Sequence, residues 1–304
     1  MKTQFALATT LAMTGGALAQ DVFAGAIRPI TAPTVADLAL PRTQLHGIYL
    51  HQNMPSTVST TLGQVPLGGD FQVYALQFEI ALNERTSIVA TKDGHIDFNP
   101  SAASPLTSQE GFADLGLGIK RALIYDTANA FVLSGIATVE IPTGESEVWQ
   151  GEGDGAINLN LAALKLCDSG VQYSGNAGLH IPFSDSQSLT ASINLHASYE
   201  ITPWFIPLIE LNWFHVFDEG DGTSNFTNQG GSLVPSVAQF EAGDLINWGS
   251  ANADVNRDIV TLGVGFRSKL TENARLGVAF EFPLTDEEEN LMDDRLTVDM
   301  VWVF

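Results

Sequence analysis

Acidic side chains and histidines are the groups of this 304-residue chain that could do acid–base or metal chemistry: 35 Asp and Glu, and six His. Two carboxylates held close together can act as general acid and general base, and Glu79 with Glu140 is one candidate pair. In a chain this rich in acids, such pairs arise by chance. We therefore assign no catalytic residue on the basis of carboxylates.

Three connecting segments are especially acidic: Gly144–Gly155, Asp218–Gly222 and Thr285–Asp294. Their mixture of Asp, Glu and Gly offers the hard oxygen ligands that divalent cations prefer. The spacing does not match that of an EF-hand loop. We predict a solvated rim that ions bridge loosely, with no defined metal site and no cofactor.

The bulk composition excludes several classes of protein. The formal net charge is −22, so no basic stripe could neutralise the phosphates of a nucleic acid. The single cysteine, Cys167, allows no internal disulfide. Lys2, the apolar stretch from Phe5 to Met13 and the small residues that follow predict a signal peptide over residues 1–19, and hence export. After it, no run of ~20 apolar residues could form a membrane helix.

The elements that must position the polar side chains show a period of two. In Leu189–Glu200, "LTASINLHASYE", apolar and polar residues alternate without exception. This pattern predicts a β-strand with one face in an apolar medium and the other in water or a polar lumen. Segments of about ten residues with this pattern recur, and we count about twelve of them.

The connections between these segments alternate in length. Tight links such as Asn83–Arg85 and Asp168–Gly170 alternate with long links such as Gly94–Gly111, Pro142–Gly155 and Asp218–Arg257. All tight turns then lie at one end, as in a bacterial outer-membrane barrel, whereas a soluble sandwich has no reason to sort its loops in this way. We predict an all-β fold: a transmembrane antiparallel up-and-down β-barrel of about 12 strands, over residues 43–304, in the outer membrane.

The last segment, Leu296–Phe304, reads "LTVDMVWVF" and has an apolar face that would contact lipid. Trp302 and Phe304 resemble the terminal assembly signal by which outer-membrane proteins are recognised. The expected partners are therefore outer-membrane lipid and lipopolysaccharide, the barrel-assembly machinery and a small-molecule substrate, but not nucleic acid.

The opposite faces of the strands would line the lumen with small polar residues and charges of both signs. This pore-lining set is Glu79, Lys120, Glu140, Asn158, Asn160, Asn176, His180, Ser192, Asn194, His196, Glu200, Arg267, Glu281, Arg295 and Asp299. It could line a wet passage whose charges select what crosses, or form inward salt bridges that plug a narrow lumen. Barrels of about eight strands are filled and those of about sixteen are open, so both alternatives remain.

Residues 20–42 precede the first predicted strand, and Pro29, Pro33 and Pro41 exclude a membrane strand there. The segment is either a periplasmic tail or a plug that folds into the lumen around a short turn at Thr34–Leu40. We prefer the tail. At the other end of the barrel, the 218–257 connection is long enough to fold inward and gate the mouth.

A lipid-modifying enzyme is the catalytic alternative. Outer-membrane phospholipases need a serine and a histidine on adjacent strands near the outer rim. His46 and His51 lie on the first strand and His215 on the ninth, but no nearby serine stands in a lipase-like context. We therefore expect no enzymatic activity. The remaining hypotheses are a channel and a plugged barrel that stabilises the membrane or binds surface partners through its acidic external loops.

Two short patches resemble a known family. Phe112–Arg121, "FADLGLGIKR", contains the pattern Asp-Leu-x-Leu-Gly-x-Lys, and Ile141–Gly144, "IPTG", precedes the glycine-rich Gly151–Gly155, "GEGDG". In these patches the chain resembles outer-membrane channels of the MetA-pathway of phenol degradation type, themselves similar to long-chain fatty-acid transporters. The resemblance implies uptake of small apolar or aromatic molecules by passive or facilitated diffusion, and supplies no catalytic residue.

Overall fold

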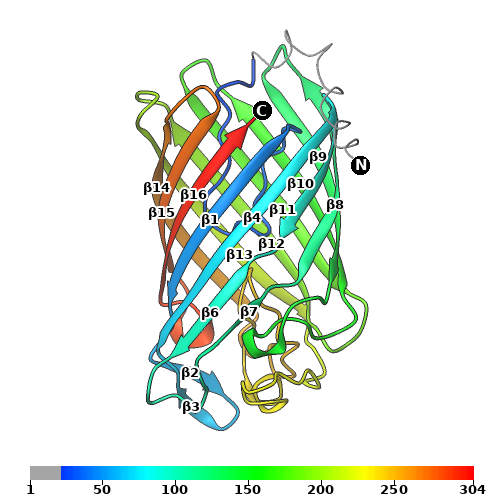
Figure 1. Ribbon diagram of the computed structural model, residues 1–304, viewed down its shortest axis with the longest axis vertical. Coiled ribbons are helices and arrows are strands. Elements are labelled where there is room, and N and C mark those ends of the chain that lie inside the picture. Colours follow the sequence, from blue (N-terminus) through cyan, green and yellow to red (C-terminus); the bar gives the residue numbers. More distant parts are fainter. Residues whose placement is uncertain (1–21) are drawn as a thin grey trace, which may run out of the picture.

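A closed antiparallel barrel of twelve strands makes up the wall of the protein (Figure 1). The computed structural model describes residues 22–304, so the predicted signal peptide lies outside the described residues. β1 (Gln44–Asn53) closes the wall by pairing with β16 (Asp294–Val303) on one side and with β4 (Gly69–Asn83) on the other. The predicted fold class, strand number and outer-membrane location are confirmed.

The strands follow one another around the barrel in chain order, and two positions in the wall are each built from two segments. These are β5 (Thr86–Lys92) with β6 (His95–Pro100), and β7 (Gln109–Phe112) with β8 (Leu115–Asp126). The remaining strands are β9 (Phe131–Ile141), β10 (Ala156–Leu166), β11 (Val171–Pro182), β12 (Leu189–Tyr199), β13 (Ile206–Asp218), β14 (Asp258–Lys269) and β15 (Ala274–Pro283).

Side chains along each strand alternate between lipid and lumen, as the period of two predicts. On β12, Leu195 is 52% exposed on the outer face, whereas its neighbour His196 is 4% exposed inside. An outward apolar face is stable in a bilayer because closure of the sheet pairs the backbone groups within the wall. None of the helices within residues 22–304 has the length and apolarity to cross a bilayer.

The tight turns gather at one end of the barrel and the long connections at the other, as predicted (Figure 1). The long connections contain a hairpin of β2 (Thr57–Thr60) and β3 (Gly63–Pro66), and the short helices η1 (Ser146–Val148), α1 (Leu233–Val237) and η2 (Glu287–Glu289).

One long connection was predicted wrongly. Residues 94–111 were expected to form a loop, but they contain β6 and most of β7, which extend the wall. Ile96 and Phe98 are buried inside, whereas His95 and Asp97 lie on the partly exposed outer side of β6. The alternation of buried and partly exposed residues is therefore present, but β6 is too short for a strand to be recognised from the sequence.

Residues 22–42 lie inside the barrel. The segment, dark blue in Figure 1, enters from the end with the tight turns, and Ala26, Ile30 and Leu38 are fully buried. The tail that we preferred from the sequence is therefore wrong, and the segment occupies the lumen. The sequence did not reveal this because the partners of its backbone are wall side chains from distant strands.

Candidate functional site

Residues 22–42 form the N-terminal segment, and Glu210 of β13 holds its first half. Its carboxylate accepts hydrogen bonds from the backbone N–H of Ile30 at 3.0 Å and of Thr31 at 2.7 Å, and from Thr31 Oγ1 at 2.6 Å. His196 Nδ1 lies 2.7 Å from the same carboxylate. Glu210 therefore satisfies buried backbone donors that have no partner in a helix or strand.

Lys120 of β8 holds the second half of the segment, after Thr34. Its Nζ lies 2.7 Å from Asp37 Oδ2 and 2.9 Å from Glu79 Oε2 of β4. Arg28 Nη1 lies 2.6 Å from the other oxygen of Asp37, and the Arg42 N–H donates to Glu79 Oε1 at 3.2 Å. These charges are buried, and their alternation of sign offsets the cost of removing them from water.

Asp299 of β16 forms a second ionic cluster in the lumen. Its two oxygens lie 2.8 Å from Nη1 and Nη2 of Arg267, and Oδ2 lies 2.8 Å from His46 Nε2. His46 Nδ1 also lies 3.1 Å from Gln77 Oε1. His46 therefore links strands inside the barrel. A phospholipase histidine would have to face lipid, and His46 does not.

The 218–257 connection folds into the barrel from the opposite end. Asp244 Oδ1 lies 2.9 Å from Arg295 Nη2 of β16, and both side chains are buried. The Thr34 hydroxyl, at the tip of the N-terminal segment, donates to the Asp244 carbonyl oxygen at 2.8 Å. The segment and the external connection therefore meet in the middle of the lumen.

Glu241 fixes the fold of this connection. Its carboxylate accepts hydrogen bonds from Ser188 Oγ at 2.7 Å, from the Trp248 N–H at 2.8 Å and from the Ser250 N–H at 2.7 Å. Burial raises the pKa of Glu241, and these three donors oppose the shift. The carboxylate thus acts as the anchor around which residues 241–250 are arranged.

Aromatic side chains close the external end of the barrel, next to Glu241. The ring centroids of Phe98 and Trp149 are 4.4 Å apart, and those of Trp149 and Trp248 are 5.2 Å apart. Phe240 packs on Trp248 at 5.3 Å, and Phe226 is buried in the same cluster. The 218–257 connection therefore contributes core residues, and it could open only by breaking this packing.

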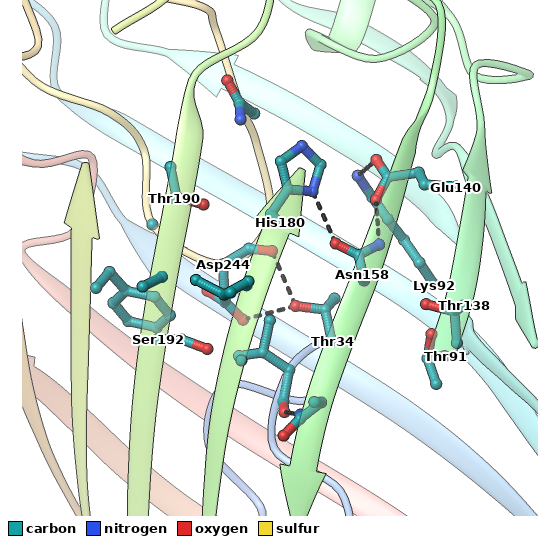
Figure 2. Close-up of a pocket in the computed structure, with 18 of the residues that line it drawn as sticks. Thr34, Thr91, Lys92, Thr138, Glu140, Asn158, His180, Thr190, Ser192 and Asp244 are labelled. Atoms are coloured by element: carbon teal, nitrogen blue, oxygen red, sulfur yellow. Dashed lines mark hydrogen bonds and ion pairs between the residues drawn. The ribbon is translucent and has the colours of Figure 1, made fainter. Parts of the chain in front are cut away.

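A small polar chamber remains between the N-terminal segment, the folded-in connection and the wall (Figure 2). Lys92 Nζ lies 2.5 Å from Glu140 Oε1, and His180 Nδ1 lies 2.8 Å from Asn158 Oδ1. The buried Nε2 of His180 has no hydrogen-bond partner. The chamber measures about 90 Å³, room for about three waters. The N-terminal segment and the folded-in connection occupy the lumen on either side of this chamber.

Fourteen of the fifteen residues predicted to line the lumen lie on inward faces of wall strands, and Glu200 directly follows β12. The structure sorts them into groups. Glu140, Asn158, Asn160, His180 and Ser192 line the chamber. Those that bond the N-terminal segment directly, or bond residues that hold it, are Glu79, Lys120, Asn176, Asn194, His196, Arg267, Glu281, Arg295 and Asp299. Glu200 lies apart, near the tight turns, where it pairs with Lys269 at 2.5 Å. Contact of any of them with a solute stays a prediction.

Several residues that organise the lumen were not anticipated. Glu210 and Asn212 lie on the inward face of a segment that was recognised as a strand, so its alternation could have identified them. Asp37 and Asp244 gave no such signal, because they come from segments without periodicity.

The wall is interrupted beside the chamber. β4 pairs with β6 up to Tyr74 and with β5 from Phe78, so residues 75–77 have no ladder partner on that side. The N–H of Leu76 donates instead to Asp93 Oδ1 at 3.3 Å, and Gln77 Nε2 donates to the Thr91 carbonyl at 2.5 Å. Side chains thus replace backbone pairing at this break.

An outer groove of about 870 Å³ leads to this break from the lipid-facing side. Tyr49, Tyr74, Leu76, Leu276 and Met300 are among its lining residues, and it reaches Asp93 and Gly94. Gly47 lies among them, and a Cβ added there would meet no atom within 4 Å. The groove therefore has room for a side chain at this lipid-facing position.

Asp114 joins the two patches that carry the family resemblance. Its Oδ1 accepts hydrogen bonds from the N–H of Gly144 at 2.9 Å and of Gly151 at 3.0 Å. Gly151 has a φ of +74°, and a Cβ there would lie 2.3 Å from the Gly144 carbonyl oxygen. Asp114, between β7 and β8, thus fixes the Gly144–Gly151 turn of the β9–β10 connection, next to the wall break.

Comparisons with known proteins agree with this architecture. A family model described as "Putative MetA-pathway of phenol degradation" matches residues 46–292. The COG4313 outer membrane channel from Pseudomonas putida F1 is 18% identical with a TM-score of 0.58, over 87% of this chain and 96% of that one. The NanC porin is 5% identical with a TM-score of 0.50, over 86% of this chain and 100% of that one. No curated protein sequence matches.

Proposed function

We propose that this chain, which belongs to the family described as "Putative MetA-pathway of phenol degradation", takes up small apolar or aromatic molecules across the outer membrane by facilitated diffusion. The family match, and a fold shared with an outer-membrane channel, support a channel role. The substrate class is our inference from the family's description and from the apolar groove outside the wall break.

One observation carries this proposal: the axial path is filled, whereas the break in the wall opens onto an apolar groove. A solute that enters from the external end would leave sideways, past residues 75–77 of β4 and Asp93, and pass along the groove into the bilayer. This route favours apolar solutes, because their transfer from water into hydrocarbon is favourable. A sugar or an ion would gain nothing from it.

Passage requires the folded-in connection to move. The contacts of Asp244 with Arg295 and Thr34 close the chamber on the side of the external connection. In this proposal they form the gate. When the gate opens, the chamber would widen, and a solute would meet the polar groups of His180 and Asn158. These are members of the pore-lining set predicted from the sequence.

The filled lumen also supports a second candidate, a plugged barrel that stabilises the membrane or binds surface partners. The ion pairs of Lys120 and Asp299 stabilise the wall whether or not a solute crosses. An enzymatic role has less support, because His46 is bonded to Asp299 inside the barrel. His215 is paired with Asp258 at 2.8 Å, but within residues 22–304 it forms no hydrogen bond with a serine.

The membrane and assembly partners expected from the sequence belong to the proposal as well. Trp302 and Phe304 are exposed at the end with the tight turns, where assembly factors of the periplasm could reach them. The exposed apolar faces of the strands supply the surface for lipid, and the long connections lie at the end that would face lipopolysaccharide.

Transfer of a fluorescent aromatic probe into liposome bilayers tests the proposed function. Refolded protein in the bilayer should accelerate transfer of the apolar probe relative to protein-free liposomes, while leaving the entry of a sugar of similar size unchanged. Equal rates with and without protein would favour the plugged barrel. Acceleration of the sugar as well would indicate a general pore.

A further inference from the structure

We propose that His95, Asp97 and Glu110 form a binding site for a divalent transition-metal ion of the zinc class on the outer surface of the barrel. One ligand atom from each residue lies within 4.8 Å of the other two. His95 and Asp97 are two residues apart on β6 and therefore share a face, and Glu110 on β7 is the cross-strand partner of Asp97.

The ligand types fit such an ion. Zinc takes imidazole nitrogen and carboxylate oxygen, and with three protein ligands it keeps a fourth position for water or another oxygen. Ligand atoms at about 2.1 Å from a tetrahedral zinc ion are about 3.4 Å apart. His95 Nδ1 and Asp97 Oδ1 are 3.7 Å apart, so an ion would fit between them after a small side-chain movement.

The charges of the site are also unbalanced without a cation. Asp97 and Glu110 lie directly opposite each other on antiparallel strands, where like charges are destabilising. Among the ion pairs within residues 22–304, Asp97 has only His95 as a partner and Glu110 has none. A divalent ion bound to both carboxylates would remove this repulsion.

The position of the site gives the ion a structural consequence. β6 and β7 pair through only four residues each, from His95–Phe112 to Phe98–Gln109. The His95 ring packs against Phe112 with centroids 5.1 Å apart, and both residues line the outer groove. A bound ion would therefore hold the short β6–β7 ladder together at the edge of the wall break. The site does not depend on the proposed transport function.

Zinc titration of the full mature protein, untagged and refolded in detergent, tests the proposal by isothermal titration calorimetry. We expect one saturable site. His95→Asn and Glu110→Gln should each weaken binding by about tenfold or more, since each removes one of three protein ligands.

A matched control is available in His215, which pairs with a single carboxylate, Asp258. His215→Asn should leave zinc affinity unchanged. Zinc binding that survives in the doubly substituted His95→Asn/Glu110→Gln protein would overturn the proposal, as would binding lost equally with His215→Asn. Binding of calcium as tight as that of zinc, and insensitive to His95→Asn, would also overturn it, since carboxylates alone would then suffice.

Discussion

Asp37 and Lys120 form a buried ion pair, with 2.7 Å between Oδ2 and Nζ, that ties the N-terminal segment to the barrel wall. The same Lys120 ammonium lies 2.9 Å from Glu79, so one side chain connects β8, β4 and the segment. Removing one member of a buried pair leaves the other charge uncompensated, which is costly. This pair is therefore the point at which the segment can be loosened by a single substitution.

Asp37→Asn should release the N-terminal segment without preventing assembly of the barrel. Lys120 keeps Glu79 as a partner, but Arg28 loses the carboxylate that lies 2.6 Å away. We expect longer and more frequent openings in single-channel recordings, and a loss of about 3 kcal/mol in the free energy of unfolding. Asp185→Asn, at an exposed residue of the 183–188 connection, is the control. Unchanged gating would mean that the segment does not block the lumen.

Asp244→Asn should loosen the external connection. The substitution removes the ion pair with Arg295 but keeps the backbone carbonyl that accepts from Thr34. Amide hydrogen exchange of residues 241–250 should become about tenfold faster, corresponding to a local loss of about 1.4 kcal/mol.

The control for this loop is Asp254→Asn, an exposed residue of the same connection. It should leave exchange at residues 241–250 unchanged. Equal acceleration by both substitutions would show that the loop responds to any loss of negative charge, and the assignment of Asp244 to the gate would fail.

Asp114→Ala should destabilise the turn that the family motif builds. Two backbone N–H groups, of Gly144 and Gly151, lose their acceptor, which costs about 2 kcal/mol. Trp149 lies within this turn and is buried, so its fluorescence during urea unfolding reports the change. Asp114→Asn keeps an amide oxygen at the position of Oδ1 and should retain most of the stability. If both variants unfolded alike, the charge of Asp114 would matter more than its hydrogen bonds.

The wall of the barrel follows from local pattern, and for that reason it could be predicted from the sequence. Each strand repeats the same alternation, of which Leu195 and His196 are one example, and the bilayer enforces it along the whole barrel. The sorting of short and long connections then fixes the order of the strands and the direction in which each one runs.

The contents of the lumen could not be predicted in the same way. The positions of Asp37 and Asp244 depend on contacts with Lys120 and Arg295, which are far away in the sequence and leave no periodic trace. The wall break escaped notice for a related reason. A strand interrupted at Asp93–Gly94 reads as a strand end followed by a loop, because the six residues of β6 are too few to show their alternation clearly.

The central claim is that solutes leave through the wall and along the outer groove, and filling that groove tests it most directly. Gly47→Trp places a large side chain in the groove, at a lipid-facing position where a Cβ meets no neighbouring atom, so folding should be unaffected. Ala177→Trp, at an exposed outer position on β11, adds the same bulk away from the groove.

The measurement is the rate at which an aromatic probe enters liposome bilayers that contain each variant. We predict that Gly47→Trp lowers the protein-dependent rate about tenfold, while Ala177→Trp leaves it unchanged. A rate that Gly47→Trp does not alter, in a protein that inserts normally, would contradict the lateral route.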